Sequence, residues 1–113
     1  MTVSVALEKS PRFKPGDEAA DLAQIKAILM HVLHGKSCAV YLFGSRATGA
    51  AQPASDFDIA VLANEDVSHE LSIARDILDE SNIPFKVDVV DLRLVAPTFR
   101  HATQTQGVLL WKN

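Results

Sequence analysis

The sequence predicts an α/β fold in which a mixed β-sheet carries helices mainly on one face. Segments with apolar residues at helical spacing alternate with short apolar runs of strand-forming residues, at 17–34, 38–43, 56–62, 66–82 and 85–92. A further short helix is predicted over 97–106 and a last strand over 108–111. The strand–helix–strand order between residues 56 and 92 is a βαβ unit, which predicts parallel pairing through a right-handed crossover.

Both long helices carry the end signals that helices require. Asp17 and Glu18 place negative charge at the start of the first helix, and Gly35 follows its last turn, where left-handed backbone suits a glycine. Asp66 or Ser68 is the predicted N-cap of the second helix. The apolar stripes are Leu22, Ile25, Ile28, Leu29, Val32 and Leu33 in the first helix and Val67, Leu71, Ala74 and Leu78 in the second.

Two carboxylates lie inside the strand predicted over 56–62. Asp56 and Asp58 share one face of this strand, whereas Phe57 and Ile59 point to the other face and the core. A carboxylate in an apolar strand is costly unless it is paired or bound to a metal, and this strand contains no lysine or arginine. Side chains at this spacing can converge on one metal ion, or on two ions about 3.5–4 Å apart of the kind that assist phosphoryl displacement.

Gly44 and Ser45 end the preceding apolar strand, and ten residues separate them from Asp56. Glycine allows close backbone approach and serine adds a hydroxyl, which suits the terminal phosphates of a nucleotide, so a magnesium-dependent nucleotidyl transfer site is predicted. The segment is not a P-loop, because alanines follow Gly49 in place of Lys-Ser/Thr. Capping of the short helical turn that follows is the structural alternative for Ser45. Arg46 has two open interpretations: contact with triphosphate or acceptor, or pairing with a carboxylate of the site.

A third carboxylate, Asp88, lies between two valines in the strand predicted over 85–92. Lys86 shares its face, so a plain Lys86–Asp88 ion pair is the structural alternative to a functional role. Asp91 falls on the opposite face, near the strand end, and is predicted to be a cap or turn residue.

Composition restricts the class of protein further. The net charge of −3 and a pI near 5.7 argue against direct nucleic-acid binding. No apolar run approaches the roughly 18 residues that span a bilayer, and we expect no signal peptide because the N-terminus lacks a basic segment followed by an apolar one. The single cysteine, Cys38, fits a reducing compartment. We therefore expect a cytoplasmic protein without membrane contact.

The residues of the predicted site carry a resemblance. Gly44-Ser45, ten intervening residues and Asp56-Phe57-Asp58 resemble the signature of the DNA polymerase beta-like nucleotidyltransferase superfamily. Within it, the segments FGSRATG and SDFDIAVL are similar to those of the minimal nucleotidyltransferases, or MNT-domain proteins. The resemblance covers Asp17 to Trp111, which leaves residues 1–16 as an N-terminal arm and 17–113 as a single nucleotidyltransferase domain.

The resemblance implies a polymerase beta-like fold, a set of site residues and a partner. The site residues that it implies are Asp56, Asp58 and Asp88 for catalysis and two Mg²⁺ ions, and Gly44, Ser45 and Arg46 for the nucleotide triphosphate. MNT proteins are usually encoded beside a HEPN-domain partner. The implied function is therefore that of an antitoxin, which transfers AMP from ATP to a tyrosine of a HEPN ribonuclease toxin and silences it.

Two other functions stay open. The protein could be a binding module that neutralises its partner by steric masking, although no residue of the motif is missing. It could also transfer a nucleotide to a small molecule, as antibiotic-modifying relatives do. A chain of 113 residues leaves no length for the acceptor-binding domain of those relatives, so the acceptor is expected on another macromolecule.

Overall fold

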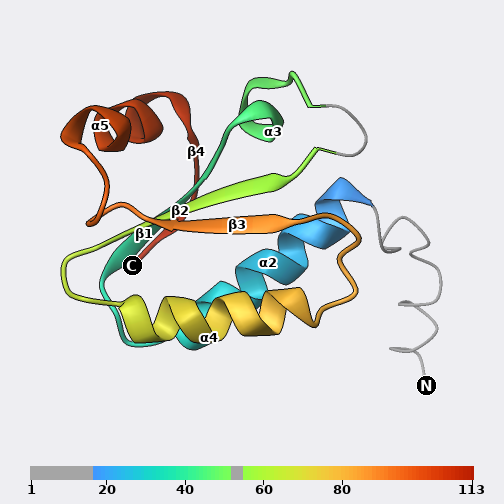
Figure 1. Ribbon diagram of the computed structural model, residues 1–113, viewed down its shortest axis with the longest axis horizontal. Coiled ribbons are helices and arrows are strands. Elements are labelled where there is room, and N and C mark those ends of the chain that lie inside the picture. Colours follow the sequence, from blue (N-terminus) through green and yellow to red (C-terminus); the bar gives the residue numbers. More distant parts are fainter. Residues whose placement is uncertain (1–16, 52–54) are drawn as a thin grey trace.

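The computed structural model describes residues 17–51 and 55–113, and the predicted N-terminal arm, 1–16, lies outside them. Its elements in chain order are α2 (Glu18–Val32), β1 (Cys38–Phe43), α3 (Ser45–Thr48), β2 (Phe57–Ala63), α4 (Ser68–Asp79), β3 (Val87–Asp91), α5 (Pro97–Gln106) and β4 (Val108–Lys112) (Figure 1). Each helix and strand predicted from the sequence is present. The largest differences at the start of an element are two residues: β3 begins at Val87 rather than at Phe85, and α4 begins at Ser68 rather than at Asp66.

The strands of the described chain form one mixed sheet in the order β3-β2-β1-β4. β1 is antiparallel to both of its neighbours, β2 and β4, whereas β2 and β3 are parallel. Since α4 connects β2 to β3, the parallel pair confirms the predicted βαβ unit.

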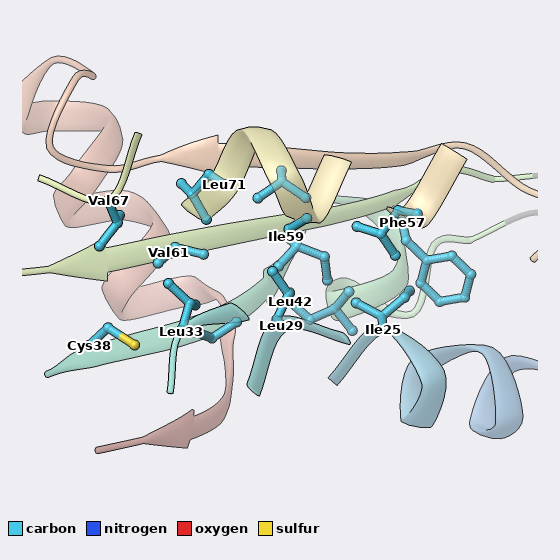
Figure 2. Close-up of a cluster of buried hydrophobic side chains, with 14 of the residues drawn as sticks. Ile25, Leu29, Leu33, Cys38, Leu42, Phe57, Ile59, Val61, Val67 and Leu71 are labelled. Atoms are coloured by element: carbon cyan, nitrogen blue, oxygen red, sulfur yellow. The ribbon is translucent and has the colours of Figure 1, made fainter. Parts of the chain in front are cut away.

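The two long helices, α2 and α4, lie side by side on one face of the sheet, and α3 and α5 lie on the other side (Figure 1). The hydrophobic core fills the space between the long helices and the sheet, and Figure 2 shows Ile25 and Leu29 of α2 packed near Leu42 and Ile59 of the sheet. This arrangement confirms the α/β fold with helices mainly on one face.

Helix α2 begins and ends as its sequence predicts. The Asp17 side chain accepts hydrogen bonds from the backbone N–H groups of Ala19 and Ala20, at 2.9 and 3.3 Å, and so caps the helix. Gly35, just beyond the last turn, has a φ of 81°, which favours glycine. No helix in the described part of the chain is long and apolar enough to cross a bilayer.

The start of α4 corrects one prediction. Neither Asp66 nor Ser68 is its N-cap, because that position is occupied by Val67, which is fully buried. Asp66, the residue before the N-cap, still binds the first turn of the helix. Its Oδ1 accepts hydrogen bonds from the Ser68 N–H at 2.9 Å and from the Ser68 hydroxyl at 2.5 Å. These bonds lower the pKa of the Asp66 carboxyl, because they favour its charged form.

Strand β2 separates the core from the candidate site. Phe57, Ile59 and Val61 are fully buried against the long helices, as their alternation predicts. Asp58 lies between them in sequence, so its side chain points to the opposite face, the one that carries α3 and α5. Asp58 is paired in register with Phe43 at the end of β1 and with Asp88 in β3.

Candidate active site

Gly44 brings the end of β1 against the carboxylate of Asp58. Its backbone, with φ 74° and ψ −157°, lies in a region that is essentially restricted to glycine. A Cβ placed on Gly44 would come within 3.1 Å of the Asp58 Cγ and closer still to its Oδ2. A glycine is therefore required here both by the backbone conformation and by the space that Asp58 occupies.

We expect Gly44→Ala to lower the rate of the predicted nucleotidyl transfer about 100-fold, because the new methyl group would displace the Asp58 carboxylate. The strained backbone should also cost about 1–3 kcal/mol of stability. Gly49→Ala is the matched control: Gly49 has a φ of 82°, but nothing lies within 4 Å of its Cβ position. Transfer rates and urea melts of both variants test this. Equal losses of transfer in both variants would show that backbone strain alone is responsible.

Two of the site's carboxylates, Asp58 and Asp88, lie on the neighbouring strands β2 and β3. Asp58 is half-buried, its in-register neighbour Asp88 is exposed, and Asp56 is exposed just before β2 begins. Burial raises the pKa of the Asp58 carboxyl, and the negative charges of Asp88 and Asp56 raise it further. The described residues contain no group of three or more His, Cys, Asp or Glu side chains arranged to hold a metal ion. The charges of Asp88 and Asp56 thus act on the half-buried Asp58 carboxylate.

Asp88 also forms the ion pair that was the structural alternative. The Lys86 Nζ lies 3.8 Å from the Asp88 Oδ1, and the two side chains are 68 % and 52 % exposed. Ion pairs this exposed typically contribute about 0–1 kcal/mol to stability. A contribution this small does not argue against a role of Asp88 in the site.

Asp91 belongs to the other face of the sheet. It pairs in register with Val61, a core residue, and it is buried. Its Oδ1 accepts a hydrogen bond from the Arg93 N–H at 3.0 Å, which shapes the turn after β3. The predicted turn role of Asp91 is confirmed.

Ser45 and Arg46 follow Gly44 in the short helix α3. Ser45 is the first residue of α3 and Gly44 is its N-cap, without a capping side-chain hydrogen bond, so the capping alternative for Ser45 is wrong. Arg46 does pair with a carboxylate, but its partner is Glu18, at the start of α2, with Nη1 and Oε2 3.1 Å apart. The predicted contact of Arg46 with the nucleotide stays a prediction.

A family model described as "Polymerase beta, Nucleotidyltransferase" matches residues 23–113, which include the glycine–serine turn and all three carboxylates. The chain therefore belongs to the polymerase beta nucleotidyltransferase family.

Relatives define its place in the family more closely. A Haemophilus influenzae protein named "Probable protein adenylyltransferase MntA" is 33 % identical over 97 residues, which cover 82 % of this chain and 81 % of that protein. A crystal structure of a toxin–antitoxin with AMP-PNP aligns with 35 % identity and a TM-score of 0.60, over 80 % of this chain and 73 % of the other. The tri-AMPylated Shewanella oneidensis HEPN toxin in complex with MNT antitoxin aligns with 32 % identity and a TM-score of 0.56, over 82 % and 71 %. Within its family the chain is of the MNT type, as the resemblance predicts.

Proposed function

We propose that this protein is a magnesium-dependent protein adenylyltransferase that transfers AMP from ATP to a hydroxyl group, a tyrosine in the first instance, of a HEPN-type toxin. It acts on its partner as an antitoxin, and we place the pair in the cytoplasm. The observation that supports this most is the contact geometry of Gly44 with Asp58, which sets a glycine–serine turn directly beside a carboxylate pair. The AMPylated HEPN toxin bound to a similar MNT antitoxin supports the choice of acceptor.

The carboxylates suit Mg²⁺ by their chemistry. Carboxylate oxygens are the ligands that this ion prefers. Burial raises the pKa of Asp58 most, the charges of Asp88 and Asp56 raise it further, and a bound cation relieves the repulsion among these charges. We propose that Asp56, Asp58 and Asp88 hold two ions. When bound, Mg²⁺ neutralises charge on the phosphates and lowers the pKa of a coordinated hydroxyl.

The side chains of the chain itself then have separate tasks. Gly44 and Ser45 bind the β- and γ-phosphates through the backbone of the turn and the serine hydroxyl. Asp58 and Asp56 would hold the Mg²⁺ whose charge orients the α-phosphate, and Asp88, on the outer strand of the pair, is proposed to lie on the acceptor side. The acceptor oxygen attacks the α-phosphorus, Asp88 helps to remove its proton, and pyrophosphate leaves. Positioning and charge account for most of the rate enhancement in this scheme.

The proposed place of the nucleoside lies beside Gly44. A pocket of about 210 Å³ there is lined by Phe43, Gly44, Thr48, Phe99, Ala102, Thr103, Gln106 and Gly107. The rings of Phe43 and Phe99 meet edge to face, with their centroids 5.7 Å apart, and both are partly exposed. We propose this pocket, between α3 and α5, as the place of the base.

Labelled ATP tests the proposed function directly. The protein is mixed with Mg²⁺, the HEPN protein encoded beside it, and ATP labelled at either the α- or the γ-phosphorus. Label on the HEPN protein from the α position alone is the expected result. No label on that protein, together with full inhibition of its ribonuclease activity, would favour steric masking. Label recovered only on a small-molecule acceptor would favour nucleotide transfer to a small molecule.

A further inference from the structure

The guanidinium of Arg46 is enclosed by the fold. Its side chain is only 6 % exposed, and its Cζ lies 4.1 Å from the centroid of the Phe57 ring and 5.1 Å from that of Phe85. Phe57 begins β2 and Phe85 precedes β3, so the cation contacts two aromatic rings from neighbouring segments of the sheet. Such contacts stabilise a desolvated cation through the negative face of each ring.

The donors of Arg46 are directed to the polypeptide. Nε and Nη2 both donate to the backbone carbonyl of Ser55, at 3.0 and 2.6 Å, and Nη1 donates to the Glu18 Oε2 at 3.1 Å. A buried charge is retained in a fold only where its hydrogen bonds are satisfied, and here all three nitrogens have partners within the chain.

The positions of these partners along the chain are informative. Arg46 directly follows the Gly44–Ser45 turn, and Ser55 directly precedes Asp56. One side chain therefore connects the proposed phosphate-binding turn with the backbone from which the first proposed metal ligand extends. Eight residues separate Arg46 from Ser55 along the chain, so this contact adds to the β1–β2 pairing a second link between the two segments.

We infer that Arg46 is a positioning residue that holds the Gly44–Ser45 turn and the Asp56 backbone in the relative arrangement that Mg²⁺–nucleotide binding requires. This inference rests on the proposed function. It assigns Arg46 an indirect role, because its donors are used within the fold rather than on a phosphate. A lysine cannot replace it fully, since an ammonium lacks the planar fork that donates twice to one carbonyl and stacks on rings.

Arg46→Lys should raise the Mg²⁺ concentration for half-maximal stabilisation by AMP-PNP about tenfold, because partners that orient metal ligands typically affect metal affinity 10–100-fold. The readout is the melting temperature at fixed AMP-PNP and increasing Mg²⁺, with no catalytic turnover involved. Phe85→Leu, which keeps the cation and removes one ring, should shift the same titration in the same direction by a smaller factor.

Arg100→Lys is the matched control. The Arg100 Nε donates to the backbone carbonyl of Leu92 at 3.0 Å, so this variant also weakens a contact between a guanidinium and a main-chain carbonyl, but far along the chain from the turn. Its Mg²⁺ titration should match the wild type even where its melting temperature is lower. An unchanged titration in Arg46→Lys would overturn the inference and leave Arg46 as a purely structural residue.

Two further outcomes are separable. If Arg46→Lys weakens the binding of AMP-PNP in the absence of Mg²⁺, Arg46 is a phosphate ligand and the positioning role is wrong. If the wild type itself shows no stabilisation by AMP-PNP and Mg²⁺ together, the proposed function fails, and the positioning role that rests on it fails with it.

Discussion

Asp58→Asn is expected to abolish AMP transfer while leaving the folded protein as stable as the wild type or more stable. The carboxylate sits in a strand, half-buried, beside the charges of Asp88 and Asp56, and these conditions raise its pKa. An amide keeps the shape of the side chain and removes the charge that the fold disfavours. It also removes the oxygen charge on which the proposed metal binding depends, so activity and stability should move in opposite directions.

The pH dependence of this gain follows from the direction of the pKa shift. Because the pKa of Asp58 is higher in the folded state than in the unfolded state, the folded protein binds this proton more tightly. The stability of the wild type therefore falls as the pH rises from about 3.9, the ordinary aspartate pKa, through the raised pKa of folded Asp58. At neutral pH the carboxyl is ionised, and its full cost to the stability of the fold is present. The advantage of Asp58→Asn should be present at pH 7 and vanish below that range.

Urea melts at several pH values, without metal, measure the free energy of unfolding of both proteins. Transfer of α-labelled AMP at pH 7 measures their activity. Asp66→Asn is a useful contrast, because hydrogen bonds from Ser68 lower the pKa of Asp66 and its replacement should destabilise the protein at neutral pH. A non-cooperative melt of Asp58→Asn would instead assign a structural role to Asp58.

The parts of this structure that the sequence predicts are those determined by local pattern. Alternation within residues 56–62 assigns Asp58 to the face opposite Ile59 and the core, and the register confirms this assignment. The order of strands and helices similarly predicts the parallel pairing of β2 with β3, because a crossover helix favours that connection.

The parts that the sequence could not predict depend on contacts between distant segments. Glu18 and Phe85 lie on either side of Arg46, separated from it by 28 and 39 residues, and no local pattern indicates that all three meet. The predicted N-cap of α4 was also wrong. The sequence offers Asp66 and Ser68 as capping residues, but the buried Val67 between them occupies the N-cap position. Tertiary packing decides such cases, so they require the fold.

A side-by-side comparison of Asp88→Asn and Asp91→Asn should separate two acids that differ by three positions in one strand. Asp88 shares a face with Asp58, whereas Asp91 shares a face with the core residue Val61. A third metal ligand must join Asp58 on its own side of the sheet, and only Asp88 does so. We expect Asp88→Asn to lower transfer by about 10²–10⁴-fold, the range for loss of a positioned acid–base group, while nucleotide binding is largely kept.

Asp91→Asn should change transfer little and cost at most about 0.5–2 kcal/mol, the range for a lost capping hydrogen bond, because the amide oxygen can still accept from the Arg93 N–H as the Asp91 Oδ1 does. Lys86→Ala is the control for the ion pair: if Asp88 served only to pair with Lys86, this variant would lose as much transfer as Asp88→Asn. Transfer rates on one HEPN acceptor and AMP-PNP affinities for all three variants provide the test. An inactive Asp91 variant beside an active Asp88 variant would reverse the assignment. Loss of transfer in both would mean that Asp91 orients the strand from the core side, and that the face of the sheet alone does not identify the third ligand.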